Sequence, residues 1–259
     1  MIVLSKREAL SEYDKVIEAL FLKKFDEAHN PDVIELDFFK DELTDIAKTM
    51  NIVIRNFPDV TYTYRTRGEM PESILQKGNW IIKQKGKSNY AFIKTRRPAF
   101  IPIQEGLAPI EISNSLPEIV EKYITGDEQG LLSAIRYNRL VDIFTEITCF
   151  HLQSHIRTTI EGEGQIEIDD LYVGIDHDGK EYILPLEAKS PDPRDKLGWI
   201  QVINLVKYSH QYFPRLKCRP ICAKPIDRNT VYLIEFEDKT DYDEIGIREI
   251  RLYHLVRTQ

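Results

Sequence analysis

The stretch "GQIEIDDLYVGIDHDGKEYILPLEAKS", residues 164–190, contains two apolar segments separated by a turn. Ile166 and Ile168 alternate with acids in the first segment, and residues 182–186 have the composition of a buried strand. Between the two segments, Asp178-Gly179 is a strong signal for a β-hairpin turn. The sequence therefore predicts two antiparallel strands joined by a tight turn.

The end of the second predicted strand carries charge. Side chains alternate along a strand, so Glu187 and Lys189 share the face opposite Leu184, Leu186 and Ala188. A structural ion pair between Glu187 and Lys189 is the simplest explanation of this pattern. The neighbouring strand offers a second explanation, because it carries acids that can meet this pair.

If the two strands pair through the turn, one edge collects Glu167, Asp169, Glu187 and Lys189. Crowded carboxylates repel one another, and a divalent cation bound by hard oxygen ligands relieves that repulsion, which favours Mg²⁺ or Mn²⁺. Alternation favours Asp169 over Asp170, which would need a twist or bulge to join the group. Both remain candidates at this point.

The motifs "EID" at 167–169 and "EAK" at 187–189 resemble the PD-(D/E)XK, or restriction endonuclease-like, nuclease superfamily. The Pro-Asp dipeptide of the family's name is absent. The resemblance implies an α/β fold with a mixed central sheet flanked by helices, and magnesium-dependent hydrolysis of phosphodiesters to 5′-phosphate and 3′-hydroxyl ends. It also implies that Asp169, Glu187 and the carbonyl of Ala188 bind the metal, and that Lys189 orients the attacking water.

Two further residues have weaker support. Glu146 lies in a segment predicted to be helical, where members of this superfamily often supply an extra catalytic glutamate, but a solvent-facing acid explains it equally well. Gln201 lies early in the helix predicted after the E-x-K strand, where related nucleases often carry a glutamine. An ordinary surface glutamine is the simpler interpretation of Gln201.

A basic segment precedes the connector of the chain. Between Ser73 and Gln104 there is no Asp or Glu, and aromatic residues alternate with cations. This pattern suits a DNA phosphate backbone, although a solvated basic hairpin also explains it. "GKS" at 86–88 lacks the upstream glycine of a phosphate-binding loop, so we expect no nucleotide cofactor. The candidate DNA-binding residues are Lys77, Lys83, Lys85, Lys87, Lys94, Arg96 and Arg97.

Periodicity predicts how the elements are organised. We expect helices over 6–29 and 35–49, and one helix or two consecutive helices from Asp127 to about Arg157. We also expect strands within 51–71, a hairpin with its turn near Gly86, and a Pro-rich connector over 98–119. A boundary near residue 125 would separate a DNA-recognition region, 1–125, from a catalytic domain, 126–259.

The composition limits the classes of protein to which the chain can belong. The formal net charge of −7 disfavours indiscriminate nucleic-acid binding, and three cysteines do not suggest a disulfide framework. With no membrane-length apolar run and no signal-peptide pattern, we expect a cytoplasmic protein with no membrane partner. His151 and His155, four apart on the expected helix, are more consistent with packing than with a metal site.

These observations favour a magnesium-dependent DNA endonuclease acting on double-stranded DNA, as a type II restriction enzyme and as a homodimer. A structure-selective repair or junction nuclease is the nearest alternative. A DNA-binding module that retains a nuclease fold without activity is the alternative outside the enzymes.

Overall fold

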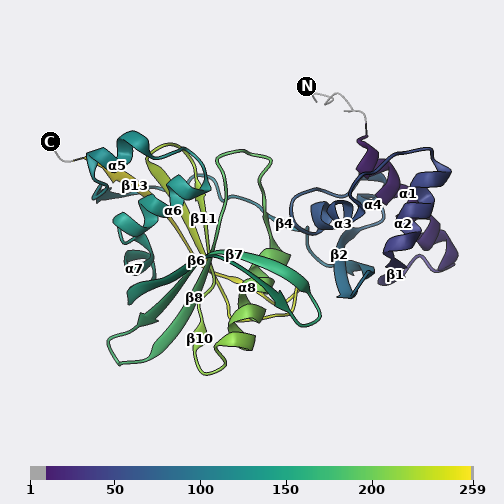
Figure 1. Ribbon diagram of the computed structural model, residues 1–259. Helices are drawn as coiled ribbons and strands as arrows, with labels where there is room; N and C mark the ends of the chain where they lie inside the picture. Colours follow the sequence, from purple (N-terminus) through teal and green to yellow (C-terminus); the bar gives the residue numbers. More distant parts are fainter. Residues whose placement is uncertain (1–9, 258–259) are drawn as a thin grey trace. The chain divides into compact units, whose positions relative to one another are not determined.

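The computed structural model describes residues 10–257 (Figure 1). The chain divides into two compact units, one ending at Ala99 and the other beginning at Phe100. The predicted boundary near residue 125 lay too far along the chain, because the predicted connector contributes strands to the second unit. Within the described residues, no helix is long and apolar enough to cross a membrane.

The first unit combines helices with a small antiparallel sheet. Its elements are α1 (Glu12–Glu27), β1 (Glu35–Phe39), α2 (Lys40–Thr49), α3 (Phe57–Thr66), α4 (Glu72–Leu75), β2 (Asn79–Gly86) and β3 (Asn89–Thr95). The sheet order is β1-β3-β2. Phe21, Phe38, Trp80 and Phe92 are fully or almost fully buried and form the centre of its core.

The predictions for this unit are correct in part. The hairpin turn near Gly86 is confirmed, and α1 lies inside the predicted helix 6–29, of which residues 6–9 are outside the described part. The predicted helix 35–49 begins with a strand, β1. The strands expected within 51–71 are wrong, because α3 occupies that segment and buries Val60, Thr61 and Tyr64 at helical spacing.

The second unit is a mixed sheet with helices on both faces. Its elements are β4 (Phe100–Ile101), β5 (Ile110–Ser113), α5 (Glu118–Tyr123), α6 (Glu128–Tyr137), α7 (Leu140–Thr145), β6 (Thr148–Ile160), β7 (Gly164–Ile175), β8 (Glu181–Ala188), β9 (Leu197–Gly198), α8 (Trp199–Tyr212), β10 (Lys217–Cys218), β11 (Ile221–Pro225), β12 (Thr230–Phe236) and β13 (Ile247–Val256).

The sheet order β5-β13-β12-β11-β8-β7-β6 places β8 near the centre of the sheet. β8 pairs antiparallel with β7 and parallel with β11, so the sheet is mixed. One apolar cluster packs α8 against the sheet, and another packs α6 and α7 against it. The predicted α/β class with a mixed sheet and flanking helices is confirmed at this level.

The predicted helix after Asp127 ends much earlier than expected. Asp127 caps α6 as predicted, because its side chain accepts a hydrogen bond from the Gly130 amide at 3.0 Å. The chain then forms α7 and turns at Glu146, whose φ of 58° is left-handed, into the long strand β6. His151 and His155 therefore lie on a strand, which removes the helical spacing on which a shared metal site would depend.

A buried ion pair connects the end of α7 to the sheet. Glu235 of β12 is fully buried and accepts two 2.7 Å hydrogen bonds from the Arg219 guanidinium. Arg219 also donates to the carbonyl of Thr145, at the end of α7, at 2.9 Å. Because the buried Glu235 depends on Arg219 for both of these hydrogen bonds, the pair helps to fix how α7 meets the sheet.

Replacing Arg219 by alanine should therefore lower the free energy of unfolding by about 3 kcal/mol, since it leaves a buried carboxylate with only the more exposed Arg248 nearby. Urea denaturation measures this change. Arg251→Ala, which removes a surface ion pair with Glu249, is the matched control and should cost less than about 1 kcal/mol. Equal losses in the two variants would contradict the assigned role of Arg219.

Candidate active site

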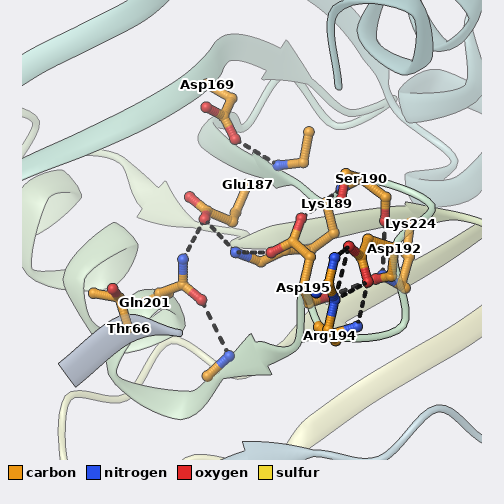
Figure 2. Close-up of polar contacts among 12 residues, drawn as sticks. Thr66, Asp169, Glu187, Lys189, Ser190, Asp192, Arg194, Asp195, Gln201 and Lys224 are labelled. Carbon is orange, nitrogen blue, oxygen red and sulfur yellow. Dashed lines mark hydrogen bonds and ion pairs between the residues drawn. The ribbon is translucent and has the colours of Figure 1, made fainter. Parts of the chain in front are cut away.

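The register of β7 against β8 brings two acids together. Asp170 lies opposite Leu186, so Asp169 lies beside the Glu187–Ala188 segment. The Asp169 carboxylate accepts a 2.7 Å hydrogen bond from the Ala188 amide, and Figure 2 shows it on the same side as Glu187. The predicted meeting of the "EID" and "EAK" segments is therefore present in the structure.

Glu187 is held by two donors from different elements. Lys189 Nζ lies 2.9 Å from Glu187 Oε1, and Gln201 Nε2 lies 2.5 Å from the same oxygen (Figure 2). Gln201 is in the first turn of α8, and its own Oε1 accepts from the Gly198 amide at 3.2 Å, which fixes the side chain. Gln201, for which a surface position was the simpler interpretation, thus contacts the candidate site directly.

Lys189 is almost fully buried, with 4% of its surface exposed, and it lies between two carboxylates. Its ammonium is 2.9 Å from Glu187 and 3.6 Å from Asp195. Burial alone would lower the pKa of Lys189, but Glu187 and Asp195 outweigh that effect and raise it. The side chain is therefore a fixed positive charge at the edge of the acid pair.

A second lysine organises the loop that follows β8. Lys224 Nζ of β11 donates to the backbone carbonyls of Ser190, Asp192 and Asp195 at 2.7, 3.0 and 2.9 Å (Figure 2). The Asp195 side chain in turn accepts from the Ser190 amide at 2.6 Å. Lys224 thus holds the loop in the shape that places Asp195 next to Lys189.

Glu128, at the start of α6, is a site acid that the sequence did not suggest. Burial, and after it the nearby charge of Asp195, raises the pKa of Glu128. The charge of Glu187 also raises this pKa, and the charge of Lys189 lowers it. Its only sequence signal is its place after the helix cap Asp127. Glu146, the helix acid that was predicted for the site, lies at the end of α7 and interacts electrostatically with Arg251 and Tyr253 instead.

Asp170 does not join Asp169. Its fully buried carboxylate accepts hydrogen bonds from Arg136 at 2.5 and 2.9 Å, from Ser154 at 2.8 Å and from Tyr172 at 2.9 Å. These partners neutralise Asp170 on the side of the sheet that α6 covers. Of the two neighbouring acids, Asp169 is therefore the one that belongs to the candidate site.

Glu167 also lies outside the group in which it was expected. It forms an ion pair with Arg157 across the β6–β7 hairpin, and both side chains are exposed. At Glu167, β7 still pairs with β6 but no longer pairs with β8. Strand alternation gives the face on which Glu167 lies, but it does not give the length over which β7 and β8 pair.

Several of the candidate DNA-binding cations already have partners within the first unit. Lys85 Nζ lies 2.6 Å from Glu35 and 2.8 Å from Asp37, both on β1, so acids distant in sequence neutralise it. Lys77 lies over the ring of Phe25, and Lys94 lies over that of Trp80. Lys83 and Lys87 are exposed on the hairpin.

The electrostatics of Asp169 distinguish it from an ordinary structural acid. Burial, reinforced by repulsion from Glu187, raises the pKa of Asp169 to about 7. The single amide donor of Ala188 opposes this shift but does not cancel it. The site therefore has too little positive charge for its acids to be ionised together, which is the condition that a bound cation relieves.

In the part of the chain that the structure describes, no three His, Cys, Asp or Glu side chains gather closely enough to form a metal cluster. Asp169, Glu187 and the carbonyl of Ala188 nevertheless offer two carboxylates and one backbone oxygen. Magnesium commonly binds through one or two carboxylates and keeps several waters. The oxygen donors and the unrelieved negative charge fit such an ion.

Comparisons with protein-family models, with curated proteins and with solved structures found no match for this chain.

The raised pKa of Asp169 predicts a pH-dependent stability. Between about pH 4 and pH 7 the folded metal-free protein retains a proton that the unfolded chain releases, so stability falls as the pH rises through this window. Asp169→Asn removes the titrating group and keeps an oxygen acceptor for the Ala188 amide. This variant should exceed the parent protein in unfolding free energy by about 2 kcal/mol at pH 8, and by little near pH 4.

Urea denaturation in a chelator at both pH values measures this difference. Glu167→Gln, which removes an exposed carboxylate from the same strand, is the matched control and should change stability little at either pH. A gain for Asp169→Asn that is equal at pH 4 and pH 8 would exclude the raised pKa as its cause.

Proposed function

We propose that this protein is a divalent-metal-dependent DNA endonuclease with a restriction endonuclease-like catalytic unit. The observation that carries the proposal is the convergence of Asp169, Glu187 and Lys189 at the end of two paired strands. Gln201 and Glu128 add polar groups from two helices on opposite faces of the sheet. If Glu187 and Lys189 formed only a structural ion pair, there would be no reason for Asp169, an acid with too few positive neighbours, to lie beside them.

Asp169, Glu187 and the carbonyl of Ala188 would hold the metal, with Mg²⁺ as the expected ion and Mn²⁺ as a substitute. An ion bound there would supply charge neutralisation at the phosphate and would lower the pKa of a water molecule. Lys189 would orient the attacking water and stabilise the charge that develops on the phosphate. Asp195 keeps the Lys189 ammonium in place, while Gln201 fixes the rotamer of Glu187.

Hydrolysis by this arrangement is expected to leave 5′-phosphate and 3′-hydroxyl ends. We further propose that the protein is a type II restriction enzyme that acts on double-stranded DNA as a homodimer, because a two-fold DNA site is matched by a two-fold protein. Digestion of defined plasmids tests the class: reproducible discrete fragments support restriction, and a preference for branched or damaged DNA supports repair. Light scattering of the purified protein tests the dimer.

Lys189→Ala should lower the rate of plasmid cleavage by about 100-fold or more, since it removes the charge that faces the reacting phosphate. Lys189→Gln provides a second variant that preserves more of the buried volume. DNA binding in a chelator and thermal melting establish that each variant is folded. Lys180→Ala, in the turn between β7 and β8, is the control and should cut normally. Cleavage that survives in both Lys189 variants would refute the mechanism.

Metal binding can be tested without any activity. Millimolar Mg²⁺ should raise the melting temperature of the parent protein at pH 8, because a cation that binds only the folded state relieves the repulsion between Asp169 and Glu187. The shift should be lost in Asp169→Asn and retained in Glu167→Gln. An unchanged melting temperature in the parent protein, or an equal shift in Asp169→Asn, would place the metal elsewhere.

A further inference from the structure

The first unit contains two consecutive helices that pack against one another, α2 and α3, followed by the β2–β3 hairpin. The break between the helices is encoded locally. Asn51 has a left-handed φ of 55° after the end of α2, and Pro58 occupies the first turn of α3. Two packed helices, here joined by residues 50–56, form an arrangement in which the second helix can enter the major groove of DNA.

The inner face of α3 is firmly held. Val60, Thr61 and Tyr64 are buried, and the Tyr64 hydroxyl donates to Asp14 of α1 at 2.6 Å. On the side towards the hairpin, Arg65 donates to Gln84 of β2 at 2.9 Å. These contacts attach α3 to both α1 and the sheet, so the helix is presented as a rigid element.

The opposite face of α3 is polar and accessible. Tyr62 and Thr66 lie one turn apart on that face and are partly exposed. Exposed Arg55 precedes the helix, and exposed Arg67 follows it with its guanidinium 5.3 Å from the Tyr62 ring centre. The one acid of α3 is Asp59, whose carboxylate accepts a hydrogen bond from Tyr13 at 3.0 Å.

The charges of the first unit are distributed unevenly along the chain. Residues 51–99, which include α3 and the hairpin, contain ten Lys or Arg and three Asp or Glu. Residues 10–50, which include α1, β1 and α2, contain five Lys or Arg and eleven Asp or Glu. The segment that carries α3 and the hairpin therefore has the net positive charge that favours a polyanion, although β1 neutralises Lys85.

The hairpin turn lies beside the start of α2. The Lys40 amide donates to the carbonyl of Ser88 in the turn at 3.0 Å, and Lys87 is exposed next to it. Lys83 and Lys85 lie along β2, and Lys85 is already paired with Glu35 and Asp37. Lys85 is therefore already neutralised, whereas Lys87, exposed at the turn, can meet a phosphate.

We infer that the outer face of α3 reads base edges in the major groove of duplex DNA, with Arg55 and Lys87 contacting the phosphate backbone on either side. Tyr62 and Thr66 are the specificity-determining side chains. This inference rests on the proposed function in taking double-stranded DNA as the partner. It moves the expected recognition element from the basic hairpin to a helix that precedes it.

The test uses the full chain in a chelator, so that DNA is bound without being cut. Duplexes enriched by the parent protein from a 40-base-pair random pool serve as the specific probe, and scrambled duplexes of the same length as the non-specific one. Tyr62→Ala and Thr66→Ala should reduce the preference for the enriched duplex by about tenfold or more. Their affinity for the scrambled duplex should stay the same.

Arg55→Gln and Lys87→Gln should behave differently from the helix variants. Each should weaken binding to both duplexes and lower the slope of log affinity against log salt by about 1. Lys48→Gln, on α2 in the acidic segment, is the matched control and should change neither quantity. Thermal melting confirms that each variant is folded.

Several results would overturn this inference: an unchanged preference in both helix variants, an effect of Lys48→Gln equal to that of Arg55→Gln, tighter binding to single strands than to duplexes, or no duplex binding. Plasmid cleavage with Mg²⁺ separates this failure from that of the proposed function. Lys189-dependent cleavage at sites unchanged in the helix variants would refute the inference alone. Base preference that depends on α3, without any cleavage, would refute the nuclease proposal alone.

Discussion

The candidate site depends on one structural constraint, the register between β7 and β8. With Asp170 opposite Leu186, Asp169 meets Glu187 on one face while Asp170 meets Arg136 on the other. A slip of one residue would exchange these faces. It would take the Asp170 carboxylate away from four hydrogen bonds and would turn Asp169 away from Glu187. The fully paired Asp170 thus stabilises the register on which the neighbouring Asp169 depends, although it takes no part in the site itself.

The same sheet explains how groups distant in sequence converge. β11 runs parallel to β8 and carries Lys224, which holds the loop after β8 through three carbonyls. α8 then starts close enough to Glu187 for Gln201 to reach it. Because each contact comes from an element anchored in a buried core, the polar groups are held by packing on several sides.

The sequence predicted what depends on local periodicity. The β7–β8 hairpin, the faces of Leu184 and Glu187, and the cap at Asp127 each follow from a few adjacent residues. Helix α3 was missed because its Thr and Tyr residues favour strands by propensity, whereas tertiary burial at helical spacing decided the outcome. Glu128 and the pairing of Lys85 with β1 depend on contacts between distant segments, which no single stretch of sequence contains.

Asp169 and Asp170 are adjacent on β7, but their charges are compensated to different extents. Asp170 is buried and surrounded by donors, so its burial is compensated where it lies. Asp169 has one amide donor and a carboxylate neighbour, and its pKa rises to about 7. Folding alone gives no reason to keep the second arrangement, because an amide at this position would be more stable at neutral pH. We therefore propose that a cation, or a substrate bound through one, compensates the charge of Asp169 and completes the site.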